Sequence, residues 1–128
     1  MGVFTGPVDK LFSIRAAANY LAGSVSSAIN FTTTADGRGF WLGTRRADND
    51  REAYRNGVTQ ATNTSNDPND YPIPPIYIGA RNLQGTGIDF PSSKECAFSS
   101  IGDGLSDTEA ANFYTAVQTF NTTLARQI

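Results

Sequence analysis

The chain has 128 residues, of which 39% are hydrophobic and 17% are charged, a length and composition typical of one globular domain with a single core. Ten basic and twelve acidic residues give a net charge of −2, and acidic residues lie among the arginines of residues 38–55, so the sequence lacks the uncompensated basic surface that nucleic-acid binding requires. The chain has no His and one Cys, which excludes an intrachain disulfide, a Cys- or His-based zinc site and a His-assisted nucleophile.

Residues 1–23 have an ambiguous secondary-structure pattern. They lack the basic start and long apolar run of a signal peptide, and no stretch of the chain reaches the about 18 apolar residues that a membrane span requires, so a membrane is not an expected partner. The stretch "DKLFSIRAAANYLAG" combines helix-favouring alanines with residues that also suit a strand. We treat residues 1–23 as an N-terminal arm, either a short helix or irregular, and place a single domain at residues 24–128.

Residues 38–62 carry the strongest local pairing signals. In "RGFWLGTRRADNDREAYRNG", Phe40 and Leu42 point to one face of a strand and Trp41 points to the other. "ADND" turns the chain, and Asn56-Gly57 forms a type I′ hairpin turn into a further strand, "VTQAT". This segment therefore predicts three consecutive antiparallel strands.

The middle of the chain alternates between loops and short strands. Residues 62–75 contain four Pro among many Asn and Asp, which predicts an exposed loop. Short strands are expected at residues 76–81 ("IYIGAR") and 95–102 ("ECAFSSIG"). Cys96 lies in the second of them and is expected to be a small core residue, the usual place of a lone cysteine among apolar neighbours.

A C-terminal amphipathic helix is expected over about residues 106–124. Ser106-Asp107-Thr108-Glu109 has the capping-box pattern, in which the Ser hydroxyl and the Glu carboxylate each accept a backbone N–H. Apolar residues then recur at three- and four-residue steps as one stripe: Ala110, Phe113, Tyr114, Val117, Phe120 and Leu124. Threonines weaken the last turns, so fraying is expected after Phe120. Short antiparallel strands sealed by one helix predict a mostly β fold, an antiparallel β-sandwich of the jelly-roll type.

Three segments resemble, in order, the back half of concanavalin A-like and laminin-G-like jelly-roll domains: "GRGFWLGTRRADNDREAYRNGV", "PPIYIGARN" and "AFSSIGDGLSDTEAANFYTAVQTF". They are most similar to the variant found in tail, fibre and other virion-surface proteins of bacteriophages and in related bacterial proteins. Tyr54-Arg55-Asn56-Gly57 matches the family's Tyr-x-Asn-Gly hairpin, Ile76 to Ala80 its Ile-Gly-Ala strand, and Ile101 to Ala110 its closing turn and helix start. The resemblance covers residues 24–126.

A full domain of this family also has a front half of strands. In place of that half, this chain has room for only a short N-terminal arm. Two sheets without their partner strands would expose rows of unpaired backbone N–H and C=O groups. We therefore expect an incomplete sandwich that neighbouring chains complete.

Paired carboxylates are the remaining route to catalysis, because sandwich-fold glycanases use two acids on one sheet face. The chain has three glutamates. Glu109 is explained by helix capping and Glu52 by a surface ion pair with Arg51, which leaves Glu95 without a partner acid. We expect no enzymatic activity.

Calcium is the one metal for which the sequence offers ligands, since laminin-G-like domains often bind it in loops. Residues 48–50 and 67–70 supply Asp and Asn oxygens, but neither run has the spacing of a defined site. Turns use the same residue types for their own backbone contacts. No cofactor is therefore expected, with calcium at these loops as the alternative.

Glycan contacts have two candidate locations. Trp41 and Tyr54 on facing strands are expected to form a cross-strand aromatic pair, either in the core or as a sugar-stacking platform. Asp67, Asp70 and Tyr71 in the proline-rich loop are the candidate ligand-binding residues.

These patterns and the resemblance predict a non-enzymatic structural or adhesive subunit of a phage-like virion, as a capsid decoration or as a tail or fibre component. Its expected location is the virion, and its expected partners are other virion proteins or copies of itself. The alternative is a carbohydrate-binding module of a cell-surface or phage receptor-binding protein, with a host-surface glycan as its ligand.

Overall fold

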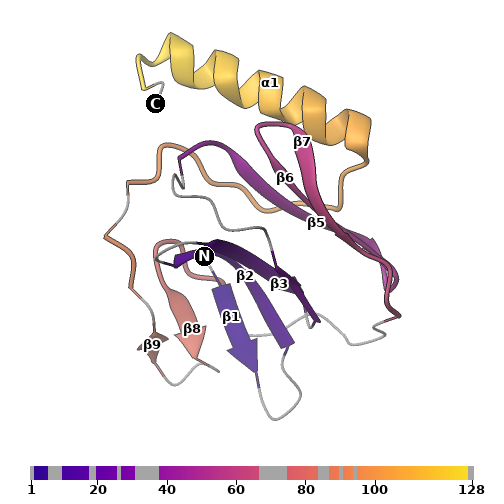
Figure 1. The fold of residues 1–128 in the computed structure, drawn as a ribbon. Helices are drawn as coiled ribbons and strands as arrows, with labels where there is room; N and C mark the ends of the chain where they lie inside the picture. The colour runs from indigo at the N-terminus through magenta and orange to yellow at the C-terminus, as the bar shows by residue number, and fades with distance from the viewer. Residues whose placement is uncertain are drawn as a thin grey trace.

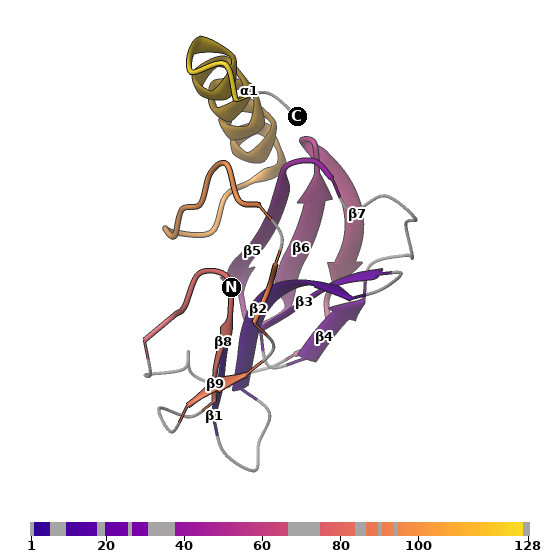
Figure 2. The same ribbon diagram turned by 90° about the vertical axis from the view of Figure 1, so that its left-hand side faces the viewer.

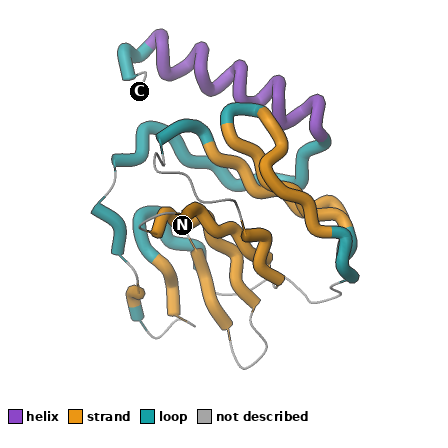
Figure 3. Tube along the Cα trace, viewed as in Figure 1, coloured by secondary structure: helices purple, strands orange, loops and turns teal. Residues whose placement is uncertain are grey.

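The computed structural model describes residues 2–5, 10–17, 20–25, 27–30, 38–66, 75–83, 87–89, 91–93 and 95–126. Within these residues the chain is mostly β, with one helix near the C-terminus (Figure 1 and Figure 3). The strands form a six-stranded sheet and a three-stranded sheet. In Figure 1 the three-stranded sheet lies between the helix above it and the six-stranded sheet below it, and Figure 2 shows the same arrangement from the side.

The six-stranded sheet is built mainly from the N-terminal part of the chain. Its members are β1 (Gly2–Thr5), β2 (Lys10–Ala17), β3 (Tyr20–Val25), β4 (Ser27–Asn30), β8 (Arg81–Leu83) and β9 (Ile88–Asp89). The first four pair in succession as an antiparallel meander. Strand β8 joins β1 in parallel and β9 pairs antiparallel with β8, so the spatial order is β4-β3-β2-β1-β8-β9.

The N-terminal segment differs from the expectations for it. Its described residues, expected to form a short helix or an irregular arm, lie in strands, and the predicted boundary between residues 23 and 24 falls inside β3. The chain also has more strands than expected, because β1 to β4 form an antiparallel meander. The local sequence could not decide between helix and strand here, since strand preference depends largely on cross-strand neighbours that exist only in the folded sheet.

The three-stranded sheet confirms the predicted hairpins. It consists of β5 (Trp41–Ala47), β6 (Asp50–Arg55) and β7 (Val58–Asn63), paired antiparallel in that order. Asn56 and Gly57 connect the last two strands with φ angles of 52° and 76°, and positive φ at both central residues is what a type I′ turn requires. The turn residues in the sequence therefore set this register.

The predicted cross-strand pair of Trp41 and Tyr54 is wrong. Tyr54 lies opposite Leu42, and Trp41 lies opposite Arg55, so the two aromatic side chains project from opposite faces of the sheet. The Arg55 guanidinium instead lies 5.2 Å from the centre of the Trp41 ring, within the range of a cation–π contact. The Trp41 ring is thus already covered on one side by a side chain of its own sheet.

Two segments expected to be strands are loops. Residues 76–80 bend at Gly79, where φ is 80°, and β8 begins only at Arg81. Residues 95–102 run as an irregular segment in which Cys96 is exposed and is not a core residue. The Cys96 thiol donates to the Phe98 carbonyl at 3.1 Å. Phe98 of this segment packs against Phe113 of the C-terminal helix without joining a strand.

Helix α1 spans Asp107–Thr123 and confirms the predicted start. Ser106 is the N-cap, and its hydroxyl and the Glu109 carboxylate form the reciprocal capping box. The helix continues past Phe120, further than the fraying that was expected. Thr119 and Thr123 each donate a hydroxyl to the carbonyl four residues earlier, which satisfies these side chains inside the last turns.

Candidate functional site

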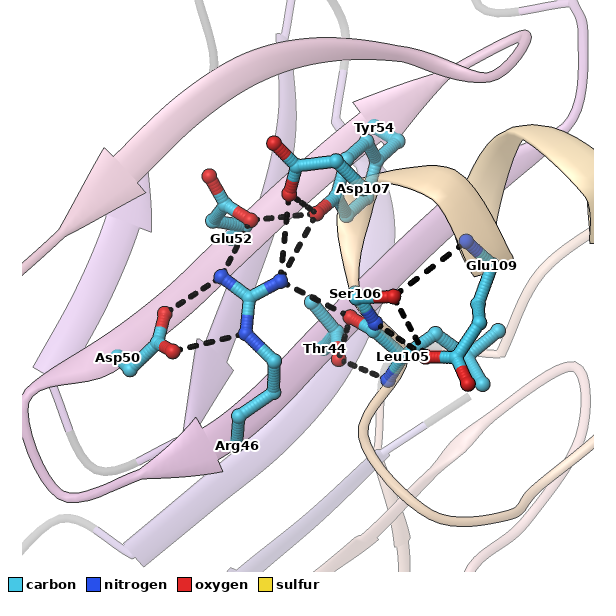
Figure 4. A network of polar contacts seen from close by, with 9 residues as sticks. All are labelled: Thr44, Arg46, Asp50, Glu52, Tyr54, Leu105, Ser106, Asp107 and Glu109. Carbon is cyan, nitrogen blue, oxygen red and sulfur yellow. Dashed lines mark hydrogen bonds and ion pairs between the residues drawn. The ribbon is translucent and has the colours of Figure 1, made fainter.

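Arg46 lies at a β-bulge near the end of β5, and its side chain contacts the start of α1. Arg45 pairs with Arg51 and Ala47 pairs with Asp50, so Arg46 is an extra residue between two paired positions. Alternate residues of a strand share a face, so Arg46 lies on the same side as Thr44, which pairs with Glu52. Its guanidinium contacts Glu52 and Tyr54 on this face and Asp107 at the start of the helix (Figure 4).

All five N–H hydrogens of the Arg46 guanidinium have acceptors. Nε and Nη2 bind the two carboxylate oxygens of Asp50 at 2.8 and 2.7 Å. The second hydrogen of Nη2 reaches Glu52 at 2.7 Å, and those of Nη1 reach the Leu105 carbonyl at 3.1 Å and Asp107 at 3.3 Å. A planar guanidinium carries five donors in a fixed geometry, so this arrangement uses the whole of its capacity.

Tyr54 adds a buried hydroxyl to the same network. The residue is 1% exposed, and its hydroxyl oxygen lies 2.5 Å from Glu52 and 2.9 Å from Asp107. A phenol has one hydrogen to donate, so the two carboxylates share it along with the hydrogens of Arg46. Glu52 and Asp107, which come from the sheet and the helix, are thereby joined through the same two donors.

The electrostatics of the network follow from these contacts. Burial raises the pKa of Tyr54 above its ordinary value, and the hydrogen bonds to Glu52 and Asp107 raise it further. The hydrogen bond from Tyr54, followed by contacts with Glu52 and Arg46, lowers the pKa of Asp107. The Arg46 guanidinium lowers the pKa of Asp50, and Asp50 in turn raises the pKa of Arg46. Each shift favours a protonated phenol and charged Asp and Arg side chains at neutral pH.

The loop before α1 is fastened to β5 by a second set of contacts. The Thr44 hydroxyl donates to the Leu105 carbonyl at 3.2 Å and accepts from the Leu105 N–H at 2.7 Å. One residue earlier, Gly104 passes so close to the Arg45 carbonyl that a Cβ at this position would clash with it. The outer edge of β5 is therefore covered by the segment that leads into the helix.

This network, which we call the Arg46 joint (Arg46, Asp50, Glu52, Tyr54 and Asp107), has the properties of a structural connection. The donors of Arg46 and Tyr54 are taken up by the three carboxylates and the Leu105 carbonyl, and Tyr54 and Glu52 are buried. The expected surface ion pair between Glu52 and Arg51 is wrong, since Glu52 bonds Arg46 and Tyr54. The arrangement fixes the angle at which α1 leaves the sheet.

The candidate ligand-binding residues Asp67, Asp70 and Tyr71 lie outside the described residues, as does the run 67–70 considered for calcium. In the other run, Asp48 forms an ion pair with Arg45 at 2.6 Å and Asp50 binds Arg46, so each carboxylate faces an arginine. Among the residues that the structure describes, no three His, Cys, Asp or Glu side chains are grouped so that they could hold a metal ion.

A cluster of aromatic rings connects the sheet with α1. Phe40 lies 5.7 Å from Phe113 and 6.0 Å from Tyr114, measured between ring centres. The Phe98 ring, in the loop that precedes α1, lies 6.0 Å from Phe113 and 6.1 Å from Phe120. Most of these rings meet edge-on or tilted, the geometry that aromatic pairs prefer. The cluster packs the inner side of the helix, together with the buried Ala110 and Val117.

The far half of α1 is less covered than its sequence predicts. Phe120 and Leu124, the last two members of the predicted apolar stripe, are each 47% exposed. In Figure 1 this half of the helix extends beyond the strands of the three-stranded sheet. Arg126 covers part of the Phe120 ring, with its guanidinium 5.5 Å from the ring centre. This end of the helix therefore presents apolar surface that the described part of the chain does not bury.

Comparison of the chain with protein-family models, with curated proteins and with solved structures gives no match. In the described part of the chain, α1 is too short and too polar to cross a lipid bilayer.

Proposed function

We propose that the chain is a non-enzymatic structural or adhesive subunit of a phage-like virion, folded as a jelly-roll-type sandwich and assembled with neighbouring chains. The observation that carries the assembly role is the incompletely covered end of α1, with Phe120 and Leu124 half exposed. Large apolar side chains that adjoin one another on a surface are typical of protein interfaces. The virion is proposed from the resemblance of the hairpin, the Ile-Gly-Ala segment and the helix start to phage jelly-roll domains.

The edges of the three-stranded sheet favour assembly through the helix over assembly through strands added to that sheet. Loop residues Gly104 and Leu105 cover the edge of β5. Strand β7 has a bulge at Gln60, whose side-chain amide donates to the carbonyls of Val58 and Thr59 at 3.1 and 3.3 Å. Bulged or covered edges resist pairing with foreign strands. Neighbouring chains are therefore expected to contact side chains of α1.

The structural role also fits the way in which polar groups are used in the described residues. Buried Tyr54 and Glu52 are committed to the Arg46 joint, which holds α1 on the sheet. A helix through which a subunit contacts its neighbours must be held firmly on the core of that subunit, because otherwise the subunit would not keep a fixed orientation in the assembly. The joint and the aromatic cluster together supply this attachment.

Virion association is tested with an antibody raised against the purified chain. We expect it to label intact particles produced by the source of the gene and to detect the chain in particles purified on a density gradient. A chain found only in the unassembled fraction would overturn the proposal. The carbohydrate-binding alternative is tested on a glycan array, where binding by the chain that is lost in Tyr71→Ala would replace the structural role.

A further inference from the structure

The last turns of α1 bury a polar atom, the amide oxygen of Asn121. This residue lies on the inner face of the helix, one turn after the buried Val117, and is 8% exposed. Its Oδ1 is buried and, among the described residues, accepts no hydrogen bond. A buried acceptor without a donor is unfavourable, because it has given up its bonds to water. We propose that residues 118–126, which we call the terminal segment, form a latch that opens away from the body of the folded chain while the earlier turns of α1 stay in place.

The helix also ends in a backbone conformation that does not suit its residue. The Ala125 N–H donates to the Thr122 carbonyl at 3.0 Å. The Arg126 N–H donates to the Asn121 carbonyl at 2.9 Å, which completes the Schellman pattern of helix ends. That pattern places one residue in the left-handed region, usually a glycine, and here Ala125 occupies it with a φ of 53°. The Cβ of alanine disfavours this conformation, and opening of the terminal segment releases it.

The closed position of the terminal segment buries little apolar surface in return. Phe120 and Leu124 are each 47% exposed although the helix is closed. The last turn contains no basic residue that would offset the negative end of the helix dipole. Opening therefore relieves two unfavourable features, at Asn121 and Ala125, and gives up only partly buried side chains.

The earlier turns of α1 are held by stronger contacts. The Arg46 joint binds Asp107, and the capping box closes the first turn. The Tyr114 ring packs on the hairpin turn at Gly57, where an added Cβ would lie 3.1 Å from a ring carbon. Val117, which is 3% exposed, is the buried apolar residue nearest to the terminal segment. We therefore expect the opening to stop at Val117.

Opening would change the surface that the chain presents. The rings of Phe98 and Phe120 lie 6.1 Å apart in the closed form, and opening separates them. The Phe98 ring then joins the apolar surface available to a neighbouring chain, and a neighbour that binds this ring favours the open form. This consequence rests on the assembly function proposed above, whereas the opening itself is a property of a single chain.

Amide hydrogen exchange of the full chain, resolved by residue with NMR, measures the opening. In the wild-type chain we expect amides of residues 121–126 to be at least about tenfold less protected than those of residues 111–117, equivalent to about 1.4 kcal/mol. Asn121→Leu removes the unsatisfied oxygen and should raise protection of the terminal segment at least about tenfold. Ala125→Gly removes the steric conflict at the helix end and should raise protection about two- to fivefold.

Each variant has a matched control in the same helix. Asn112→Leu makes the first replacement at an exposed position, without removing a buried acceptor, and should change protection of the terminal segment by less than about twofold. Ala116→Gly makes the second replacement inside the helix, where glycine is unfavourable, and should not raise protection. The NMR spectrum of each variant verifies that the chain is folded.

The inference is overturned when the wild-type terminal segment is as protected as residues 111–117. It is also overturned when Asn121→Leu raises protection no more than Asn112→Leu, or Ala125→Gly no more than Ala116→Gly. These results are separable from the virion proposal. A chain that is present in purified particles but has a uniformly protected α1 removes the latch and leaves the virion role. A chain whose terminal segment opens but which is absent from particles does the reverse.

Discussion

Arg46 and Asp50 form a bidentate ion pair in which Nε lies 2.8 Å from one carboxylate oxygen and Nη2 lies 2.7 Å from the other. The pair spans the turn between β5 and β6, and it leaves three guanidinium hydrogens free to reach Glu52 and the start of α1. One side chain thus closes the hairpin and attaches the helix to it. Lysine, which has no planar fork, cannot reproduce both sets of contacts.

Replacing this side chain should destabilise the fold strongly. Arg46→Met leaves Asp50, Glu52 and Asp107 without their shared positive charge, and Glu52 is buried, so we expect a loss of about 2–3 kcal/mol in the free energy of unfolding. Arg46→Lys should fall between this variant and wild type. Urea unfolding followed by Trp41 fluorescence measures the series.

The matched control for that series is Arg126→Met, because Arg126 is exposed and lies beyond the last turn of α1. Its unfolding free energy should stay within about 0.5 kcal/mol of wild type. If Arg46→Met were as stable as this control, the Arg46 joint would not hold the helix on the sheet.

The buried phenol of Tyr54 should make stability fall in alkali. Its pKa is raised in the folded chain, so above about pH 10 the unfolded chain loses this proton while the folded chain keeps it. The unfolded state then binds fewer protons, and the free energy of unfolding decreases as pH rises. Tyr54→Phe removes this contribution, so its stability should decline less steeply than that of wild type over the same range.

At neutral pH the same variant should lose about 1–2 kcal/mol, because Glu52 and Asp107 lose a hydrogen-bond donor. Tyr77→Phe is the control, since Tyr77 is exposed. Urea unfolding at several pH values from about 8 to about 11 gives the slopes. Equal alkaline slopes for Tyr54→Phe and wild type would show that the Tyr54 phenol does not retain its proton in the folded state.

The parts of the fold that the sequence predicted are those set by neighbouring residues. The turn at Asn56-Gly57 fixes its own backbone conformation, and the Ser106–Glu109 capping box fixes the helix start. Both are complete within a few residues of sequence. The three-stranded sheet and the helix therefore followed from local chemistry.

The parts that could not be predicted depend on distant partners. Strand β1 pairs with β8 across most of the chain, and nothing in "GVFT" indicates that partner. The Arg46 joint depends on Asp107, which lies 61 residues after Arg46 in the sequence, so no local pattern around Arg46 indicates that contact. The density of arginines and acids around residues 45–52 is the available signal, but in the sequence it indicates only compensated charge and a surface ion pair of Glu52 with Arg51.

The loop that covers β5 should not tolerate a side chain at Gly104. A Cβ at that position would clash with the backbone carbonyl of Arg45, which cannot move without disturbing the strand. Gly104→Ala should therefore cost about 1–3 kcal/mol of unfolding free energy. Gly102→Ala is the matched control two residues earlier, where a Cβ meets open space. Similar melting temperatures for the two variants would show that the loop does not lie against β5 in solution.

Asn56 should stabilise the turn in two ways, by tolerating a left-handed backbone conformation and by accepting a hydrogen bond with its side chain. The backbone N–H of Asn56 donates to the Phe40 carbonyl at 2.8 Å, and the side-chain Oδ1 accepts from the Phe40 N–H at 2.9 Å, so Asn56 holds Phe40 in the aromatic cluster. Its φ of 52° lies in the left-handed region. Asn56→Asp keeps the acceptor and tolerates that region, Asn56→Gly keeps the conformation alone, and Asn56→Ala keeps neither.

We therefore expect stability to decrease in the order Asp, Gly, Ala at position 56. The aspartate variant should stay close to wild type. The glycine variant should lose about 1 kcal/mol because it lacks the hydrogen bond. The alanine variant should lose a further ~1–2 kcal/mol because its backbone is held in the left-handed region. Thermal unfolding of the three variants gives the order. An alanine variant as stable as the glycine variant would show that position 56 does not adopt a left-handed turn, and the register of β6 and β7 would then need another cause.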